Sequence, residues 1–255
     1  MTIDTNAHLG HWPFRRHGFE DTGKFLDKMR AAKVDEAWVA SFDSVLHKDV
    51  AGVNERLAAE CRERGPGLLV PFGTVNPRLP DWAEDLRRCR EVHKMPGVRL
   101  YPNYHAYSLD DPDFVRLLRL TADAKLLIQV VVKMEDERTH HPLIKVPAVE
   151  LAPLPKAIAG IAGLRLQLLN CPVPPAGEAL LPLARAGVFF DLAMQEGVGA
   201  VSRLVDRVGP DRVLFGSHFP LFHAESALLK LKEASLAADT ERAIRSGNAR
   251  TLLPT

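Results

Sequence analysis

The sequence lacks an excess of charge of either sign. Its 33 Lys and Arg residues nearly balance its 32 Asp and Glu residues, and the formal net charge is +1. Binding to nucleic acid or to an anionic membrane usually requires a basic excess, so we expect neither partner. No apolar run approaches the roughly 20 residues that a membrane-spanning helix needs. No basic and then apolar segment typical of a secretory signal is visible, and we therefore expect a cytoplasmic protein.

Cysteine is scarce as well. The three cysteines, Cys61, Cys89 and Cys171, are widely spaced and form no CxxC pair. An odd number at such spacing favours reduced thiols over a disulfide framework. The first predicted strand is also not followed by a glycine-rich phosphate turn, which an open doubly wound sheet would favour.

Eight short apolar runs, each bounded by turn residues and followed by a helical pattern, are present instead. Such runs are typical of buried parallel strands. A chain of 255 residues has the usual length of a (β/α)₈ TIM barrel. We therefore predict an α/β protein with one barrel domain over residues 1–255, and an open doubly wound sheet as the alternative. The predicted strands are residues 3–8, 36–41, 68–75, 97–102, 126–132, 164–170, 188–194 and 213–216.

The segment 134–155 interrupts this alternation. It is rich in charge and contains four prolines, so it cannot form one uninterrupted helix. Long insertions of this kind are often functional loops. We predict that residues 134–147 cover the mouth of the barrel and bring Glu135 or Arg138 near the pocket.

Polar residues gather at the ends of the predicted strands. In the first strand, Asp4, Asn6 and His8 lie two residues apart and therefore point the same way. Active sites of TIM barrels lie at the carboxyl ends of the strands, so these ends predict one polar pocket. The alternative is that Asn6 and His8 only form hydrogen bonds beneath the following loop. Further strand-end residues are Asn76, Arg99, Tyr101, Gln129, Asn170, Asp191, Glu196, Ser217 and His218.

Four segments resemble the amidohydrolase-related family, the branch of the metal-dependent amidohydrolase superfamily that includes aminocarboxymuconate-semialdehyde decarboxylase. They are IDTNAH at 3–8, GVRLYP at 97–102, LFGSHFP at 214–220 and GNARTLL at 247–253. The resemblance implies a (β/α)₈ barrel. It also implies hydrolysis or non-oxidative decarboxylation of a small molecule, usually with one divalent metal.

The chain departs from this family at the metal ligands. The His-x-His pair of the first strand is replaced by Asn6 and His8, and the usual histidines of strands five and six correspond to Gln129 and Asn170. The usual aspartate of strand eight corresponds to His218. His8 and His218 are then the only strong zinc ligands, so we predict that zinc binds weakly or not at all.

Three interpretations remain open. The first is an enzyme with an altered metal site on His8 and His218, completed by water or by residues such as Asp191 or Glu196. The second is an enzyme without metal in which His8 or His218 transfers protons. The third is a catalytically silent barrel that binds a small ligand or a protein partner.

The predicted substrate is a small organic acid, amide or lactone. Arg99 suits a substrate carboxylate, although a salt bridge to Asp4 or Asp191 is equally plausible. We place His8, His218 and Arg99 in the catalytic group. The aromatic run after strand four could instead meet another subunit, so a homo-oligomer stays open. The predicted substrate-binding residues are Asn6, Trp12, Arg15, Tyr101, His105, Gln129, Glu135, Arg138, His141 and Asn170.

Overall fold

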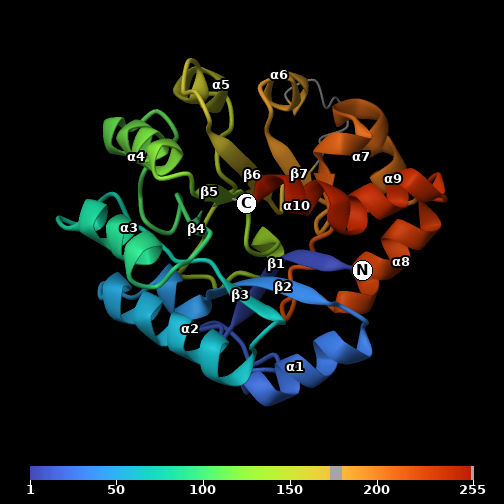
Figure 1. Cartoon of the computed structure of the whole chain (residues 1–255), viewed down its shortest axis with the longest axis horizontal. Helices are drawn as coiled ribbons and strands as arrows, with labels where there is room; N and C mark the ends of the chain where they lie inside the picture. Colours follow the sequence, from blue (N-terminus) through green and yellow to red (C-terminus); the bar gives the residue numbers. More distant parts are fainter. Residues whose placement is uncertain (173–179, 254–255) are drawn as a thin grey trace.

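The computed structural model describes residues 1–172 and 180–253, and it forms a parallel barrel ringed by helices (Figure 1). Neighbouring strands pair in parallel and in sequence order, β1 to β3 and β4 to β8. The strands are β1 (Ile3–Leu9), β2 (Glu36–Ser41), β3 (Leu69–Pro71), β4 (Gly97–Leu100), β5 (Leu127–Val131), β6 (Arg165–Leu169), β7 (Phe189–Asp191) and β8 (Val213–Leu214).

Backbone hydrogen bonds across two seams close the barrel. Between β8 and β1, the Thr5 amide donates to the Phe215 carbonyl at 2.9 Å and the His8 amide to the Phe219 carbonyl at 2.9 Å. Between β3 and β4, the Arg99 amide donates to the Gly73 carbonyl at 2.7 Å. A (β/α)₈ barrel is therefore confirmed, and the open doubly wound sheet is excluded.

Ten helices surround the barrel in the described part of the chain, and the last of them lies across one end of it (Figure 1). None of those described is long and apolar enough to cross a membrane. They are α1 (Thr22–Ala31), α2 (Val50–Arg64), α3 (Trp82–Glu91), α4 (Pro112–Asp123), α5 (Leu154–Ile158), α6 (Leu180–Arg185), α7 (Ala200–Val208), α8 (Ala224–Glu233), α9 (Ala238–Arg242) and α10 (Asn248–Leu252).

Several short helices close the chain near its C-terminus. Ser235 has a left-handed backbone (φ 49°) that ends α8 and turns the chain into α9. A short π-helical turn, Ala243–Gly247, then leads into α10. Several strands are also shorter than predicted. Their last predicted residues do not pair with a neighbouring strand, although most of them are buried.

Candidate active site

Four strand ends bring one chain of polar side chains together in the barrel. Asn6 Nδ2 donates to Asn170 Oδ1 at 2.7 Å and to Asp191 Oδ2 at 2.6 Å. The Asn170 amide donates to Asp191 Oδ1 at 3.0 Å, and Asn170 Nδ2 lies 3.2 Å from His218 Nδ1. His218 Nε2 lies 2.7 Å from the Met134 carbonyl oxygen. All four side chains, Asn6, Asn170, Asp191 and His218, are fully buried.

This network fixes the proton on His218. A carbonyl oxygen only accepts hydrogen bonds, so Nε2 carries the proton and donates a hydrogen bond to the Met134 carbonyl. Nδ1 is then free to accept from Asn170 Nδ2. Burial lowers the pKa of His218 to about 4, and the bond to Met134 only partly opposes this shift. His218 is therefore a neutral imidazole with one defined tautomer.

Two buried carboxyl groups are found here, Asp191 within the network and Asp4 nearby. Burial raises the pKa of Asp191 to about 7, against the opposing hydrogen bonds from Asn170 and Asn6. Burial also raises the pKa of Asp4 to about 6, although the Ser217 amide donates to its Oδ1 at 2.9 Å. Near neutral pH, Asp191 is thus a carboxyl group able to hold or release a proton.

His8 points into the same region with the opposite proton arrangement. Its Nε2 lies 3.3 Å from Arg99 Nη1 and 3.1 Å from the Tyr101 hydroxyl. Because a guanidinium only donates, Nε2 accepts and the proton lies on Nδ1. Burial keeps the pKa of His8 well below its usual value, and its ring stacks on Phe42 with centroids 4.8 Å apart.

Arg99 is fully engaged by the protein. An arginine side chain has five N–H donors, and each has an acceptor in this structure. None is left to bind a substrate carboxylate, and the expected ion pair with Asp4 or Asp191 does not form among the described residues. The acceptors are Gln129 Oε1 at 2.9 Å, His8 Nε2 at 3.3 Å, and the carbonyl oxygens of Ala7, Thr5 and Trp38 at 2.6, 3.2 and 3.1 Å.

The site carries backbone strain and unpaired polar atoms. Asn170 and His218 have left-handed backbones, with φ of 56° and 59°. This region is uncommon for residues other than glycine, and such strain clusters at functional sites. Asn6 Oδ1 and His8 Nδ1 are buried and have no hydrogen-bond partner among the described residues. One is an acceptor and the other a donor, so β1 presents both functions inside the barrel.

Met134 and Glu135 form a plug over this network. Both are buried, and Met134 provides the carbonyl that holds His218. The Glu135 carboxylate accepts from Trp12 Nε1 at 2.8 Å and from Arg15 Nε at 2.7 Å. This part of the predicted lid thus contacts His218, Trp12 and Arg15, and its role as a lid over a bound substrate stays a prediction.

Other predicted substrate-binding residues lie elsewhere. Arg138 is exposed and binds its neighbour Asp136 at 2.8 Å, and His141 is exposed on the same loop. His105 is buried and lies 3.0 Å from the Ser44 carbonyl. Gln129 Nε2 donates to Gln167 Oε1 at 2.8 Å, in a layer beneath the network.

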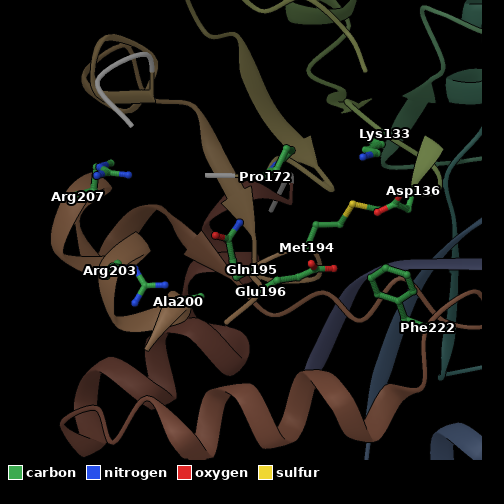
Figure 2. Close-up of a pocket in the computed structure, with 10 residues that line it drawn as sticks. All are labelled: Lys133, Asp136, Pro172, Met194, Gln195, Glu196, Ala200, Arg203, Arg207 and Phe222. Atoms are coloured by element: carbon green, nitrogen blue, oxygen red, sulfur yellow. The ribbon is translucent and has the colours of Figure 1, made fainter. Parts of the chain in front are cut away.

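An open pocket of about 570 Å³ lies beside the buried network. Figure 2 shows Arg203 and Arg207 on one side of it and Lys133 and Asp136 on the other. Sequence analysis did not predict the two arginines as site residues. Their spacing of four on a helix was visible, but it did not indicate that this helix borders the mouth. The remaining lining residues described are Pro172, Met194, Gln195, Glu196, Ala200 and Phe222.

Phe222 connects the pocket with the buried network. It lines the pocket, and its ring meets the His218 ring edge-on with centroids 5.3 Å apart. A ligand in the pocket would therefore lie one aromatic ring away from His218.

Comparisons with known proteins agree with this fold. The family model described as Amidohydrolase matches residues 3–255. The structure of 5-carboxyvanillate decarboxylase from Sphingomonas paucimobilis matches with a TM-score of 0.79 at 15% identity, over 99% of this chain and 98% of that chain. A 2,6-dihydroxybenzoate decarboxylase in complex with 2,6-dihydroxybenzoate matches with a TM-score of 0.77 at 16% identity, over 99% and 98%.

A third similar structure contains a metal. The dihydroxybenzoic acid decarboxylase from Polaromonas sp. JS666, with bound manganese and the inhibitor 2-nitroresorcinol, matches with a TM-score of 0.76 at 14% identity, over 98% of this chain and 96% of that chain. These likenesses show a shared barrel fold. The search of curated proteins found no match.

Proposed function

We propose, from the premise that the chain belongs to the amidohydrolase family over residues 3–255, that it is a metal-independent enzyme acting on a small organic acid, amide or lactone. The reaction is hydrolysis or non-oxidative decarboxylation, in a single barrel domain. Aromatic carboxylic acids are the first substrates to test, because the similar structures include decarboxylases of such acids.

The residues present do not fit the divalent metal that the family usually holds. Both oxygens of Asp191 already accept hydrogen bonds, and Nε2 of each histidine is committed, to Met134 or to Arg99. The Arg99 guanidinium beside His8 would also repel a cation. Among residues 1–172 and 180–253, no group of three His, Cys, Asp or Glu residues is arranged to hold a metal ion. This closed network, in which both Asp191 oxygens and Nε2 of both histidines are already engaged, is the observation that carries metal independence.

An inert scaffold would not be expected to retain these features. Three kinds of feature meet in one place. They are two strand-end residues with left-handed backbones, two unpaired buried polar atoms, and a carboxyl group that titrates near neutral pH. Each feature costs folding free energy, and their coincidence is typical of active sites.

Within the proposed mechanism, Asp191 is the acid–base group. Its pKa of about 7 allows it to deliver a proton to a carbanion after decarboxylation, or to accept one from an attacking water. His8 Nδ1–H and Asn6 Oδ1 are the free donor and acceptor that orient the substrate. His218 Nε2–H becomes a further donor once the Met134 carbonyl moves away. Turnover therefore requires displacement of the Met134–Glu135 plug.

The test combines metal content with turnover. Protein purified without chelators is analysed for metal and assayed by mass spectrometry with 2,6-dihydroxybenzoate, 5-carboxyvanillate and related amides and lactones, with and without EDTA. We expect turnover that EDTA leaves unchanged. Asp191→Asn should abolish turnover, whereas Asp206→Asn, at an exposed position on α7, should not. Loss of activity with EDTA, or one metal per chain that survives dialysis, would contradict metal independence.

A second candidate is a catalytically silent barrel that binds a ligand. The observation in its favour is closure, because His218 and Arg99 are fully buried with their nitrogens engaged by the protein. Binding of a small acid without turnover of any compound in the panel would support this candidate against the enzyme.

A further inference from the structure

We infer that the pocket lined by Arg203, Arg207 and Lys133 binds a flat organic dicarboxylate. The inference rests on the proposed function only in that the ligand is a small organic acid. The pocket volume of about 570 Å³ lies within the range of roughly 300–1,000 Å³ usual for small-molecule sites. None of the lining residues belongs to the buried network around Asn6 and His218.

The two arginines form the first anion-binding end. Arg203 and Arg207 are four residues apart on α7, so their side chains lie on the same helix face. Like charges at this spacing destabilise a helix. An anion held between the two guanidiniums would remove this repulsion, and planar guanidinium groups match the two oxygens of a carboxylate. The Val198 carbonyl accepts from Arg203 Nη1 at 2.6 Å and so holds the side chain in place.

Lys133 is the second end, across the pocket from the arginines (Figure 2). It lies two residues after the end of the barrel strand β5 and is half-buried. Among residues 1–172 and 180–253, no carboxylate lies within ion-pair distance of Lys133, Arg203 or Arg207. Two separate cationic ends favour a ligand with two anionic groups over one with a single charge.

The two acidic residues of the pocket also interact with cations outside it, although the charge of Lys133 acts on Asp136 as well. Asp136 is held by Arg138 at 2.8 Å, and this contact keeps the pKa of the Asp136 carboxyl well below its usual range. The charge of Glu196 acts on Arg138 and on Lys230, neither of which lines the pocket. Among the described lining residues, the three cations Lys133, Arg203 and Arg207 outnumber the two carboxylates Asp136 and Glu196, so this part of the pocket carries a positive balance.

Apolar groups lie between the two ends. Met194, Phe222 and Pro172 line the pocket, and Figure 2 shows Met194 between the arginines and Lys133. A flat ring packs well against a thioether and an aromatic face. The chemical class is therefore a planar, largely apolar body with a carboxylate at each end.

The experiment measures binding and not turnover, by calorimetric titration of the full chain. The probes are terephthalate with two carboxylates, benzoate with one, and benzamide with none. We expect terephthalate to bind at least about fivefold more tightly than benzoate, and benzamide to bind most weakly. An exposed ion pair contributes up to about 1 kcal/mol, which corresponds to about fivefold in affinity.

Variants then assign the two ends. Arg203→Gln, Arg207→Gln and Lys133→Gln should each weaken terephthalate binding about fivefold, whereas Arg119→Gln on the exposed face of α4 should leave it unchanged. High salt should reduce the preference for terephthalate. Equal binding of terephthalate and benzamide, no binding up to 10 mM, or equal effects of all four variants would overturn the inference. Binding without turnover would count against the enzyme and leave the dicarboxylate site standing, and turnover without pocket binding would do the reverse.

Discussion

The buried Glu135 carboxylate should hold the plug in place, and its removal should be costly. It accepts hydrogen bonds from Trp12 Nε1 at 2.8 Å and from Arg15 Nε at 2.7 Å. In Glu135→Ala the fully buried Trp12 N–H loses its acceptor, which costs about 1–3 kcal/mol. The Arg15 side chain is 45% exposed, so loss of that ion pair adds at most about 1 kcal/mol. The free energy of unfolding should therefore fall by about 1–4 kcal/mol.

Urea unfolding monitored by tryptophan fluorescence measures this loss. Glu137→Ala is the matched control, because Glu137 is exposed two residues further along the same loop, and its effect should stay within about 0.5 kcal/mol. A Trp12→Phe variant has no indole N–H that could lose its acceptor. In that variant, Glu135→Ala should therefore lower the free energy of unfolding by about 1–3 kcal/mol less than it does in the parent protein. Hydrogen exchange at residues 132–136 should also accelerate. If Glu135→Ala and Glu137→Ala cost the same, or the two substitutions are additive, Glu135 does not hold the plug.

Three further predictions concern the buried groups. The folded-state pKa of His218 is about 4, below the usual 6.5, so its stabilising contribution is complete above pH 6.5 and is lost as the pH falls through 4. In urea titrations, the difference in unfolding free energy between the parent and His218→Gln should shrink by about 2 kcal/mol from pH 7 to pH 5. A constant difference would contradict a buried neutral imidazole. Arg99→Lys replaces five donors by three and should lower the free energy of unfolding by about 2–4 kcal/mol, with Arg119→Lys as a neutral control; equal effects would show that the internal contacts of Arg99 contribute little. Burial raises the pKa of Cys61, Cys89 and Cys171 to about 12, so Ellman's reagent should label these thiols only after unfolding, and rapid labelling of the native protein would refute their burial.

The sequence by itself determined the barrel and the identity of its strand-end residues. Apolar runs separated by amphipathic helices are local patterns, and a parallel sheet built from eight of them closes as a barrel. Closure then brings Asn6, Asn170 and His218 together, although they are distant in sequence, because the carboxyl ends of all strands meet at one face. The prediction that these positions depart from the usual metal ligands likewise rests on residue identity alone.

Only the tertiary structure decided what each side chain binds. Arg99 was expected to meet a substrate carboxylate or an ion-pair partner, yet its donors meet mainly backbone carbonyls. Every residue carries such a carbonyl, so no sequence pattern can single out the ones that will lie within reach. The same holds for the Met134 carbonyl on His218.

The pocket beside the network also depends on packing. Arg203 and Arg207 border it because α7, which packs against α6, α8 and β8, lies opposite a loop that follows β5. Their helical spacing is a local property, but the position of that helix face over the barrel mouth depends on loop lengths and side-chain packing around the whole ring. Local patterns therefore determined which groups the protein carries, and the closed barrel determined which of them are buried, paired or open to a ligand.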